Sequence, residues 1–535
     1  MSKVIEQPTR PFIPYSLCAL LFVCVWLQVF IARNVMLDTI LLQILGSCMA
    51  AALGLWYVKY AHTSLMTVGT VLLLLVIIFI KSSFIYASQM ASVDLLESTA
   101  IHDFELVVSR DLVYKNHAWT GQANVMYQGR CIGSVGLHAK EPFLRETHLC
   151  CEGRFTQYKD KEFSEEQFKR GVLGSIQITK VNSKTYGEGI IGEVAQFREN
   201  CISQLQPEQS FGRALVACGL CAYRPSLYSF NIPRIFMRCG LMHLIAISSC
   251  HMVILSVFID AFLKKLTIKP LLRGVVNLFL LSSYALFCGL PASAMRAILL
   301  VEQKYVMQYV GRKNHTLSAV SIVALFMLCI DPQLSVNIAF TLSLACIFGM
   351  NIYGGLAQYY AKIAFRISGY GKIQKILRKP FSDVRNTMCA TTVAQLSCLP
   401  ISCMYFGHFS LLAPLSSALI TSLFSLLSLF GIGAIALCWF KPAQDVASCL
   451  VDFLGQFIET LSSFLSERSF ASVSLTDMSW IVSLLVFAAM VALYVFWPKG
   501  KRVILSGICL MVFMLILGLS IYWKFFSPTR ICVMD

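Results

Sequence analysis

The sequence predicts a polytopic α-helical membrane protein with about 10 to 12 spans and one small β-barrel domain inserted after the third span. Of its residues, 57% are hydrophobic and 13% are charged, and the mean hydropathy is +0.69. Soluble globular proteins are only about 45 to 50% apolar. The formal net charge is +16, yet the one long polar segment, residues 94–210, holds 13 Lys and Arg against 16 Asp and Glu. The positive excess therefore belongs to the membrane part and its loops, where topology accounts for it.

The chain begins with three apolar runs, each of about 20 residues and long enough to cross a bilayer. They lie at residues 12–31, 37–57 and 66–86. Lys3 and Arg10 precede the first run, so the positive-inside rule places the N-terminus in the cytoplasm. No small-residue cleavage site precedes Arg33, and we expect the first run to be retained as a span. Residues 1–90 are assigned to these three spans, after which the chain lies outside.

Residues 91–210 form the polar segment, which we predict to be the barrel. Short alternating runs separated by glycine and charged residues are typical of strands. They are Phe104–Val108, Ala118–Tyr127, Cys131–Leu137, His148–Tyr158 and Ser175–Val181. Five such strands favour an oligonucleotide-binding (OB-like) barrel. In an oxidising exterior, Cys131, Cys150 and Cys151 could supply one disulfide, or they remain unpaired thiols.

A stretch beginning at Gly240 contains two histidines and two serines within a run that is otherwise apolar enough to cross a membrane. The histidines are His243 and His251. On one continuous helix turning about 100° per residue, both would share a stripe with Gly240. Histidines on such a seam either bond to a neighbouring helix or line a polar cavity, and the residues leave both open. Ser248 lies between them and raises the alternative of an intramembrane hydrolase, although no nucleophile-elbow glycine pattern and no nearby acid support it.

Arg296 is the most informative single residue. A basic cluster from Lys264 to Arg273 marks the cytoplasmic side. The next helix is predicted to break at residues 289–291, and the apolar stretch that follows contains Arg296. A guanidinium at bilayer depth is costly unless it meets water, an anion or a carboxylate. Either it forms an ion pair with Glu302 or Asp331, which the residue alone favours, or it lines a path for a phosphate-bearing substrate.

Further apolar runs occupy most of the remaining chain. They lie at residues 315–330, 334–356, 388–410, 412–440, 480–497 and 503–523. The basic run from Lys362 to Arg385 is predicted to be a cytoplasmic loop, whose charge reflects topology alone, contact with anionic lipid or binding of a soluble partner. The piece 446–465, with two acids, either crosses the membrane or lies in its interface. Residues 211–440 are assigned to a transmembrane core and 441–523 to C-terminal helices and spans, with the C-terminus outside.

The order of these motifs resembles the ComEC family of competence proteins. The central motif of that family is matched by His243, Ala246, Ile247, Ser248 and His251. Its next two motifs resemble Pro291, Ser293, Arg296 and Ala297, and then Asp331, Pro332, Phe340, Leu342 and Ser343. Its later helix starts resemble Leu399–Pro400, Phe406–Gly407 and Ala413–Pro414. Ser249 and Ser417 depart from the pattern, since the family usually has glycine and asparagine there.

The resemblance implies a channel that carries one strand of DNA across the bacterial cytoplasmic membrane, with an OB-like domain outside. It implies that Arg296 and the histidines contact phosphates, and that Asp331, Phe340 and Ser343 belong to the same path or motif. The implied partners are single-stranded DNA, the lipid bilayer, a cytoplasmic ATPase or helicase and an outer DNA receptor. Because the sequence contains no GxxxxGK[ST] loop, we expect directional pulling to come from a separate ATPase or from a strand-binding ratchet on the inner side.

Residues 524–535 resemble the first strand of the metallo-β-lactamase-like domain that many members of that family carry, and we expect the rest of that domain to be missing. No histidine follows His408, and a hydrolytic zinc site needs several His and Asp ligands at close spacing. The sequence therefore predicts no catalytic residue, no metal site, no cofactor and no enzymatic activity. From the residues alone, the main alternative to a DNA channel is a transporter for a smaller anionic solute.

Overall fold

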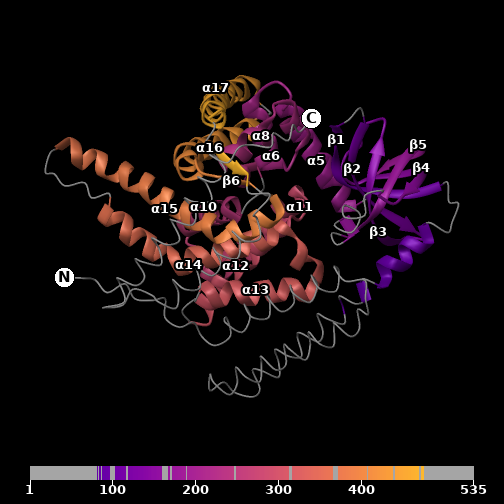
Figure 1. Ribbon diagram of the computed structural model, residues 1–535, viewed down its shortest axis with the longest axis horizontal. Coiled ribbons are helices and arrows are strands. Elements are labelled where there is room, and N and C mark those ends of the chain that lie inside the picture. Colours follow the sequence, from indigo (N-terminus) through magenta and orange to yellow (C-terminus); the bar gives the residue numbers. More distant parts are fainter. Residues whose placement is uncertain are drawn as a thin grey trace, which may run out of the picture.

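The computed structural model places a β-barrel beside a bundle of helices (Figure 1). It describes residues 81–96 with gaps, 103–115, 118–158, 167–168, 171–187, 189–245, 249–311, 316–364, 372–406, 408–437, 440–468 and 471–474. The three predicted N-terminal spans lie almost entirely outside these residues. The predicted spans 480–497 and 503–523, and the segment 524–535, lie outside them as well.

The barrel is closed and has the strand order β1-β2-β3-β5-β4. Its strands are β1 (Asp103–Lys115), β2 (Ala118–Tyr127), β3 (Arg130–Ala139), β4 (Thr147–Thr156) and β5 (Val172–Tyr186). All neighbours are antiparallel except β3 and β5, which are parallel. Every second residue points inward, as Leu106, Val135, Leu149 and Ile176 do, and these side chains are at most 1% exposed. The prediction of a small five-stranded barrel is confirmed.

The three barrel cysteines are free thiols. Cys131 lies on β3, and Cys150 and Cys151 are neighbours on β4. Because successive residues of a strand point to opposite faces, Cys150 is exposed while Cys151 is buried in the barrel. Burial raises the pKa of the Cys151 thiol to about 12.

Helices make up the rest of the described chain. They are α5 (Gly189–Leu205), α6 (Phe211–Cys221), α7 (Pro225–Ser229), α8 (Ile232–Cys239), α9 (Met242–Ile245), α10 (Ser249–Lys265), α11 (Pro270–Cys288), α12 (Ala292–Tyr309), α13 (Thr316–Ile330), the 3-10 turn η1 (Pro332–Val336), α14 (Ile338–Ala364), α15 (Lys372–Phe406), α16 (Ala413–Ala436) and α17 (Lys441–Ser466). A two-stranded sheet joins β6 (His408–Ser410) to β7 (Ser472–Ser474). Within the described residues, three stretches are long and apolar enough to cross a membrane: Pro270–Cys288, Ile338–Gln358 and Ala413–Ala436.

Two sequence predictions are corrected. Gly240 is not part of a helix with His243, because it adopts a left-handed conformation (φ 71°) that ends α8, and α9 begins only at Met242. The run from Lys362 to Arg385 is not one loop. Its first residues belong to α14 and those from Lys372 onward belong to α15, so most of the basic residues are helical.

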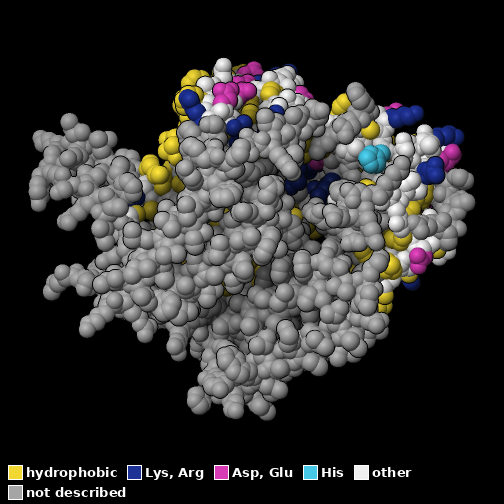
Figure 2. All heavy atoms as spheres, in the orientation of Figure 1, with side chains coloured by type: hydrophobic (Ala, Val, Ile, Leu, Met, Phe, Trp, Pro, Cys, Tyr) yellow, Lys and Arg dark blue, Asp and Glu magenta, His cyan; other side chains and the backbone are white. Residues whose placement is uncertain are grey.

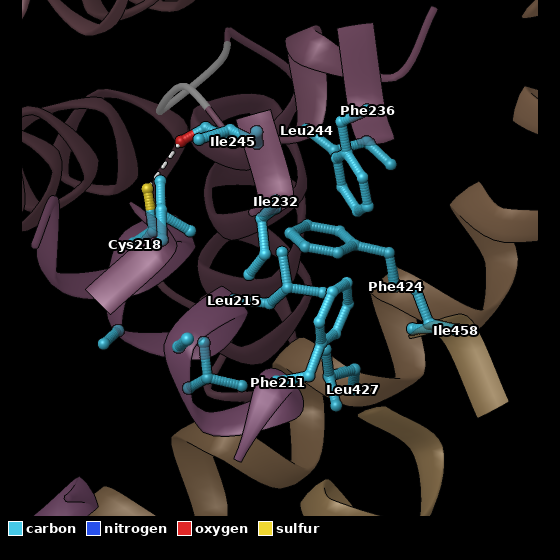
Figure 3. Close-up of a cluster of buried hydrophobic side chains, with 14 of the residues drawn as sticks. Phe211, Leu215, Cys218, Ile232, Phe236, Leu244, Ile245, Phe424, Leu427 and Ile458 are labelled. Carbon is cyan, nitrogen blue, oxygen red and sulfur yellow. Dashed lines mark hydrogen bonds between the residues drawn. The ribbon is translucent and has the colours of Figure 1, made fainter. Parts of the chain in front are cut away.

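Several buried apolar clusters hold the described helices together, and two of them bear on the site. One joins α6, α8, α9, α16 and α17, and Figure 3 shows Phe211, Phe236 and Phe424 from three of these helices among the aliphatic side chains. Within it, the Cys218 thiol donates to the carbonyl of Ile245 at 3.0 Å and so ties α9 to α6. The other contains α13 and α14, with α12 packed against them.

The barrel rests on helix C-termini. Three cations from the barrel and its flanking segments donate to carbonyls at the ends of α6, α11 and α13, where such groups have no partner within the helix. They are Arg198 to Cys221 O at 2.6 Å, Arg145 to Leu286 O at 3.3 Å, and Lys81 to Cys329 O at 3.1 Å. Arg198 also forms a two-pronged ion pair with Asp111 of β1, at 3.1 and 2.5 Å. These contacts define one end of the helical core, here called the barrel end.

Candidate functional site

The site begins at the turn between α11 and α12, which lies at the barrel end. Gly289 ends α11 with a φ of 88°, which glycine adopts without strain, and Pro291 precedes the first residue of α12. The guanidinium of Arg145 lies against this turn, so close that a Cβ on Gly289 would be 2.1 Å from its Nη1. Burial and the charge of Arg198 both lower the pKa of Arg145. The barrel is thus in direct contact with the start of α12.

Arg296 follows the start of α12 by four residues, which places it about 6 Å along the helix from the barrel end. Among the described residues it is the largest side chain that is fully buried, with 0% exposure. Its Nη2 donates to the hydroxyl of Ser343 on α14. Its helix neighbours Ala294, Ala297 and Ile298 are buried apolar residues. The guanidinium is therefore enclosed between α12 and α14 in surroundings that are largely apolar.

Two helix caps position Ser343. Asp331 accepts a hydrogen bond from Gln333 N at 2.9 Å and begins η1, with Pro332 in the first position. Asn337 then begins α14, because its Oδ1 accepts from the backbone N–H groups of Ala339 and Phe340 at 3.0 and 3.2 Å. These caps fix where η1 and α14 start.

Phe340 fixes the rotation of α14. Its ring is 0% exposed and packs in the core formed with α13, among residues that include Val320 and Leu328. Ser343 follows three residues later, so the two side chains lie on the same side of the helix. Phe340 thus acts through packing, and it places the Ser343 hydroxyl toward Arg296.

The two acids that the sequence predicted as partners of Arg296 have other positions in the structure. The carboxylate of Asp331 caps η1. Glu302 follows Arg296 by six residues on α12, about 9 Å further along the axis and on a different face. Neither position favours the ion pair that the sequence suggested. The hydroxyl of Ser343 accepts a hydrogen bond from this guanidinium.

The predicted site residues do not all come together. Arg296, Phe340 and Ser343 lie around one contact between α12 and α14, and Asp331 supports it from the preceding turn. His243 is exposed on α9, which packs mainly against α6 and α8. Ser248 and the side chain of His251 lie outside the described residues.

Comparison with known families places this site in context. A family model described as "Competence protein" matches residues 226–500, which is more than half of the chain. The chain belongs to the competence-protein family. The match contains all of the helices from α8 to α17, and therefore Arg296, Asp331, Phe340 and Ser343, whereas the barrel lies before it. No curated protein and no solved structure matches the chain.

Membership of the competence family, together with the apolar helices, points to a membrane protein with a role in DNA uptake for transformation. Sequence reasoning missed two residues of the site. Asn337 could have been found, since asparagine is a preferred N-cap and stands directly before an apolar helix. The contact of Arg145 with the α11–α12 turn depends on how the barrel docks, and no local pattern indicates it.

Proposed function

We propose that this protein is a channel for single-stranded DNA across the cytoplasmic membrane, and that Arg296 contacts the phosphates of the passing strand. The observation that supports this most is the position of Arg296. A permanent cation lies fully buried between two helices, one turn from the end of the core on which the barrel rests. Charged side chains at such depth are costly and often mark pathways for charged substrates in membrane proteins.

The barrel supports a nucleic acid as substrate. Its closed five-stranded order, with β3 and β5 parallel, is that of oligonucleotide-binding barrels. Figure 2 shows charged side chains of both signs on it, without one continuous basic surface on the visible face. We therefore expect weak binding to the strand that involves few phosphate contacts and has a shallow dependence on salt. The barrel would guide the strand, and the core would conduct it.

In the proposed channel, the described arrangement corresponds to a closed state. Arg296 is 0% exposed and bonded to Ser343, so a strand reaches it only if α12 and α14 move apart. A phosphate oxygen would then replace the Ser343 hydroxyl as the acceptor, with a stronger hydrogen bond because both partners are charged. Such contacts involve no base and suit transport without sequence preference.

The test is DNA uptake by cells that lack the native gene and produce Arg296→Ala, Arg296→Lys or Ser343→Ala. Loss of one charge-assisted hydrogen bond, worth about 1.5 to 3 kcal/mol, lowers uptake about 10- to 150-fold in Arg296→Ala. Arg296→Lys retains the charge and a part of the uptake, and Ser343→Ala, which removes only the resting contact, changes it least.

Arg238→Ala is the matched control. Arg238 is a half-buried arginine of the same family region, and its guanidinium donates to the carbonyl of Arg468. Uptake per amount of inserted protein should remain normal in this variant. Normal uptake in Arg296→Ala as well would refute the proposal. Retained transport of a small anion together with normal DNA uptake in that variant would assign Arg296 a structural role.

A further inference from the structure

Helices α14 and α15 approach each other unusually closely near the site. On α14, Gly349 faces Ser397 of α15, and a Cβ added to Gly349 would lie 1.7 Å from Ser397 Oγ. Ser397 is buried, and its hydroxyl donates within its own helix to Val393 O at 2.7 Å. Small residues at a helix crossing allow backbones to come this close. At this crossing, α14 and α15 are therefore near enough for short side chains to bridge them.

A cysteine stands on each side of this crossing. Cys346 precedes Gly349 by one turn on α14, and Cys398 directly follows Ser397 on α15. The Cys398 thiol donates to the carbonyl of Leu342 at 3.2 Å, and that carbonyl is one turn before Cys346. In an α-helix the carbonyl of Leu342 points toward the amide of Cys346, so the Cys398 thiol lies beside the backbone at Cys346. A disulfide requires Cα atoms about 4.4 to 6.8 Å apart, which close helix crossings provide.

We propose that Cys346 and Cys398 form a dithiol that closes to an intramolecular disulfide between α14 and α15. The oxidant is a small apolar disulfide, R–S–S–R, because the pair lies beside Met350, an apolar side chain that is 42% exposed. One cysteine thiolate attacks the reagent, forms a mixed disulfide and releases one RSH. The second cysteine attacks the sulfur of the first and releases the second RSH, so that the protein loses two hydrogens and the reagent gains them.

The disulfide would act on the site described above. Cys346 follows Ser343 by three residues on the same side of α14, and it lies within electrostatic reach of Arg296. A covalent bond there fixes α14 to α15 beside the turn that holds Ser343, so α14 can move away from α12 only if α15 moves with it. This consequence rests on the proposed channel function, whereas formation of the disulfide does not.

The first experiment measures the disulfide directly. The full-length protein in lipid vesicles is treated with dithiodipyridine, remaining thiols are alkylated, and the peptides are analysed by mass spectrometry. The expected product is a linked pair of peptides containing Cys346 and Cys398. It should persist in the control variant Cys389→Ser, which changes another half-buried cysteine of α15.

Absence of the linked pair in a sample where the exposed Cys131 and Cys449 are modified would overturn the proposal. In Cys346→Ser, Cys398 should instead retain a single pyridylthio group, because the second step has no attacking thiol. Recovery of Cys398 as a free thiol in this variant, with Cys449 modified, would also count against it.

The second experiment measures DNA uptake in treated cells. Oxidation should reduce uptake in the native chain and in Cys389→Ser, a reductant should restore it, and Cys398→Ser should be resistant. If the linked peptide forms and uptake is unchanged, the effect on the site is wrong. If untreated cells of every variant, including the native chain, take up no DNA, the channel proposal fails while the disulfide stands.

Discussion

The ion pair between Asp111 and Arg198 should be the strongest link between the barrel and the helices. Both side chains are nearly inaccessible, at 9% and 3% exposure, and they are joined at 3.1 and 2.5 Å. Burial opposes the charge on Arg198, but Asp111 outweighs it and raises the pKa of that guanidinium. Asp111→Ala would leave this cation buried without its carboxylate, which costs about 3 to 5 kcal/mol.

Labelling of Cys221 provides the assay. Cys221 is 0% exposed, and its carbonyl accepts from Arg198 Nε, so a maleimide reaches its thiol only when this contact opens. Since 1.4 kcal/mol corresponds to a factor of ten, Asp111→Ala should accelerate labelling about 100-fold or more. The double variant Asp111→Ala with Arg198→Met should label at nearly the native rate, because replacing both members of a buried pair by apolar groups is often neutral.

The matched control is Glu152→Ala, which breaks the exposed pair between Glu152 and Lys180 on the same barrel. Pairs at such exposure contribute about 0 to 1 kcal/mol, so labelling of Cys221 should change little. Equal acceleration in the single and the double variant would refute the reasoning, since the cost would then come from lost packing and not from an uncompensated charge.

Three other predictions concern stability, and each is tested by measuring the melting temperature of the purified protein. Gly349→Ala should destabilise the protein by about 1 to 3 kcal/mol, because the added Cβ would clash at the α14–α15 crossing. Gly354→Ala should be neutral or stabilising, because a Cβ at Gly354 on the same helix would meet open space. Equal effects of the two substitutions would contradict the close approach of α14 and α15. Asn337→Ala should lower the stability by about 1 kcal/mol because it removes the N-cap of α14, whereas Asn337→Asp should retain most of the stability that the cap provides. No difference in stability between the two variants would exclude a capping role. Because burial raises the pKa of Cys151 from an ordinary value of 9.0 to about 12, the stability it contributes is complete below pH 9 and is lost as the pH rises toward 12. Alkaline destabilisation should therefore be weaker in Cys151→Ala, and identical pH profiles would contradict this.

The barrel was predictable because its core follows a strict period of two. Each predicted strand is present, but β5 extends from Val181 to Tyr186 beyond its predicted end. Those last residues are exposed, so hydrophobicity gives no signal for them, and they are held as a strand by backbone pairing with β4. Pairing across strands is a tertiary property, which local patterns do not contain.

For the helical site, the sequence indicated which residues belong to it but not which of them are in contact. Arg296 and Ser343 stand out as unusual polar residues, but they are 47 positions apart and meet only because α13 and η1 return the chain. The stripe through Gly240 failed for a physical reason. Glycine is common both at helix crossings and at the C-terminal ends of helices, where it adopts a left-handed backbone conformation. Here Gly240 ends α8 in that conformation. The cations that anchor the barrel could not be predicted either, because their acceptors are helix ends fixed by the whole core.

The most direct test of the channel proposal is to trap DNA during its passage. A photoreactive phenylalanine analogue is introduced at position 343, beside Arg296, or at position 350, whose side chain is 42% exposed on the same helix. Labelled DNA is added to competent cells, uptake is stalled, and the cells are irradiated. The proposal predicts a covalent adduct of DNA with the protein at position 343 and none at position 350. Adducts at neither position in cells that continue to take up DNA would show that the strand passes elsewhere.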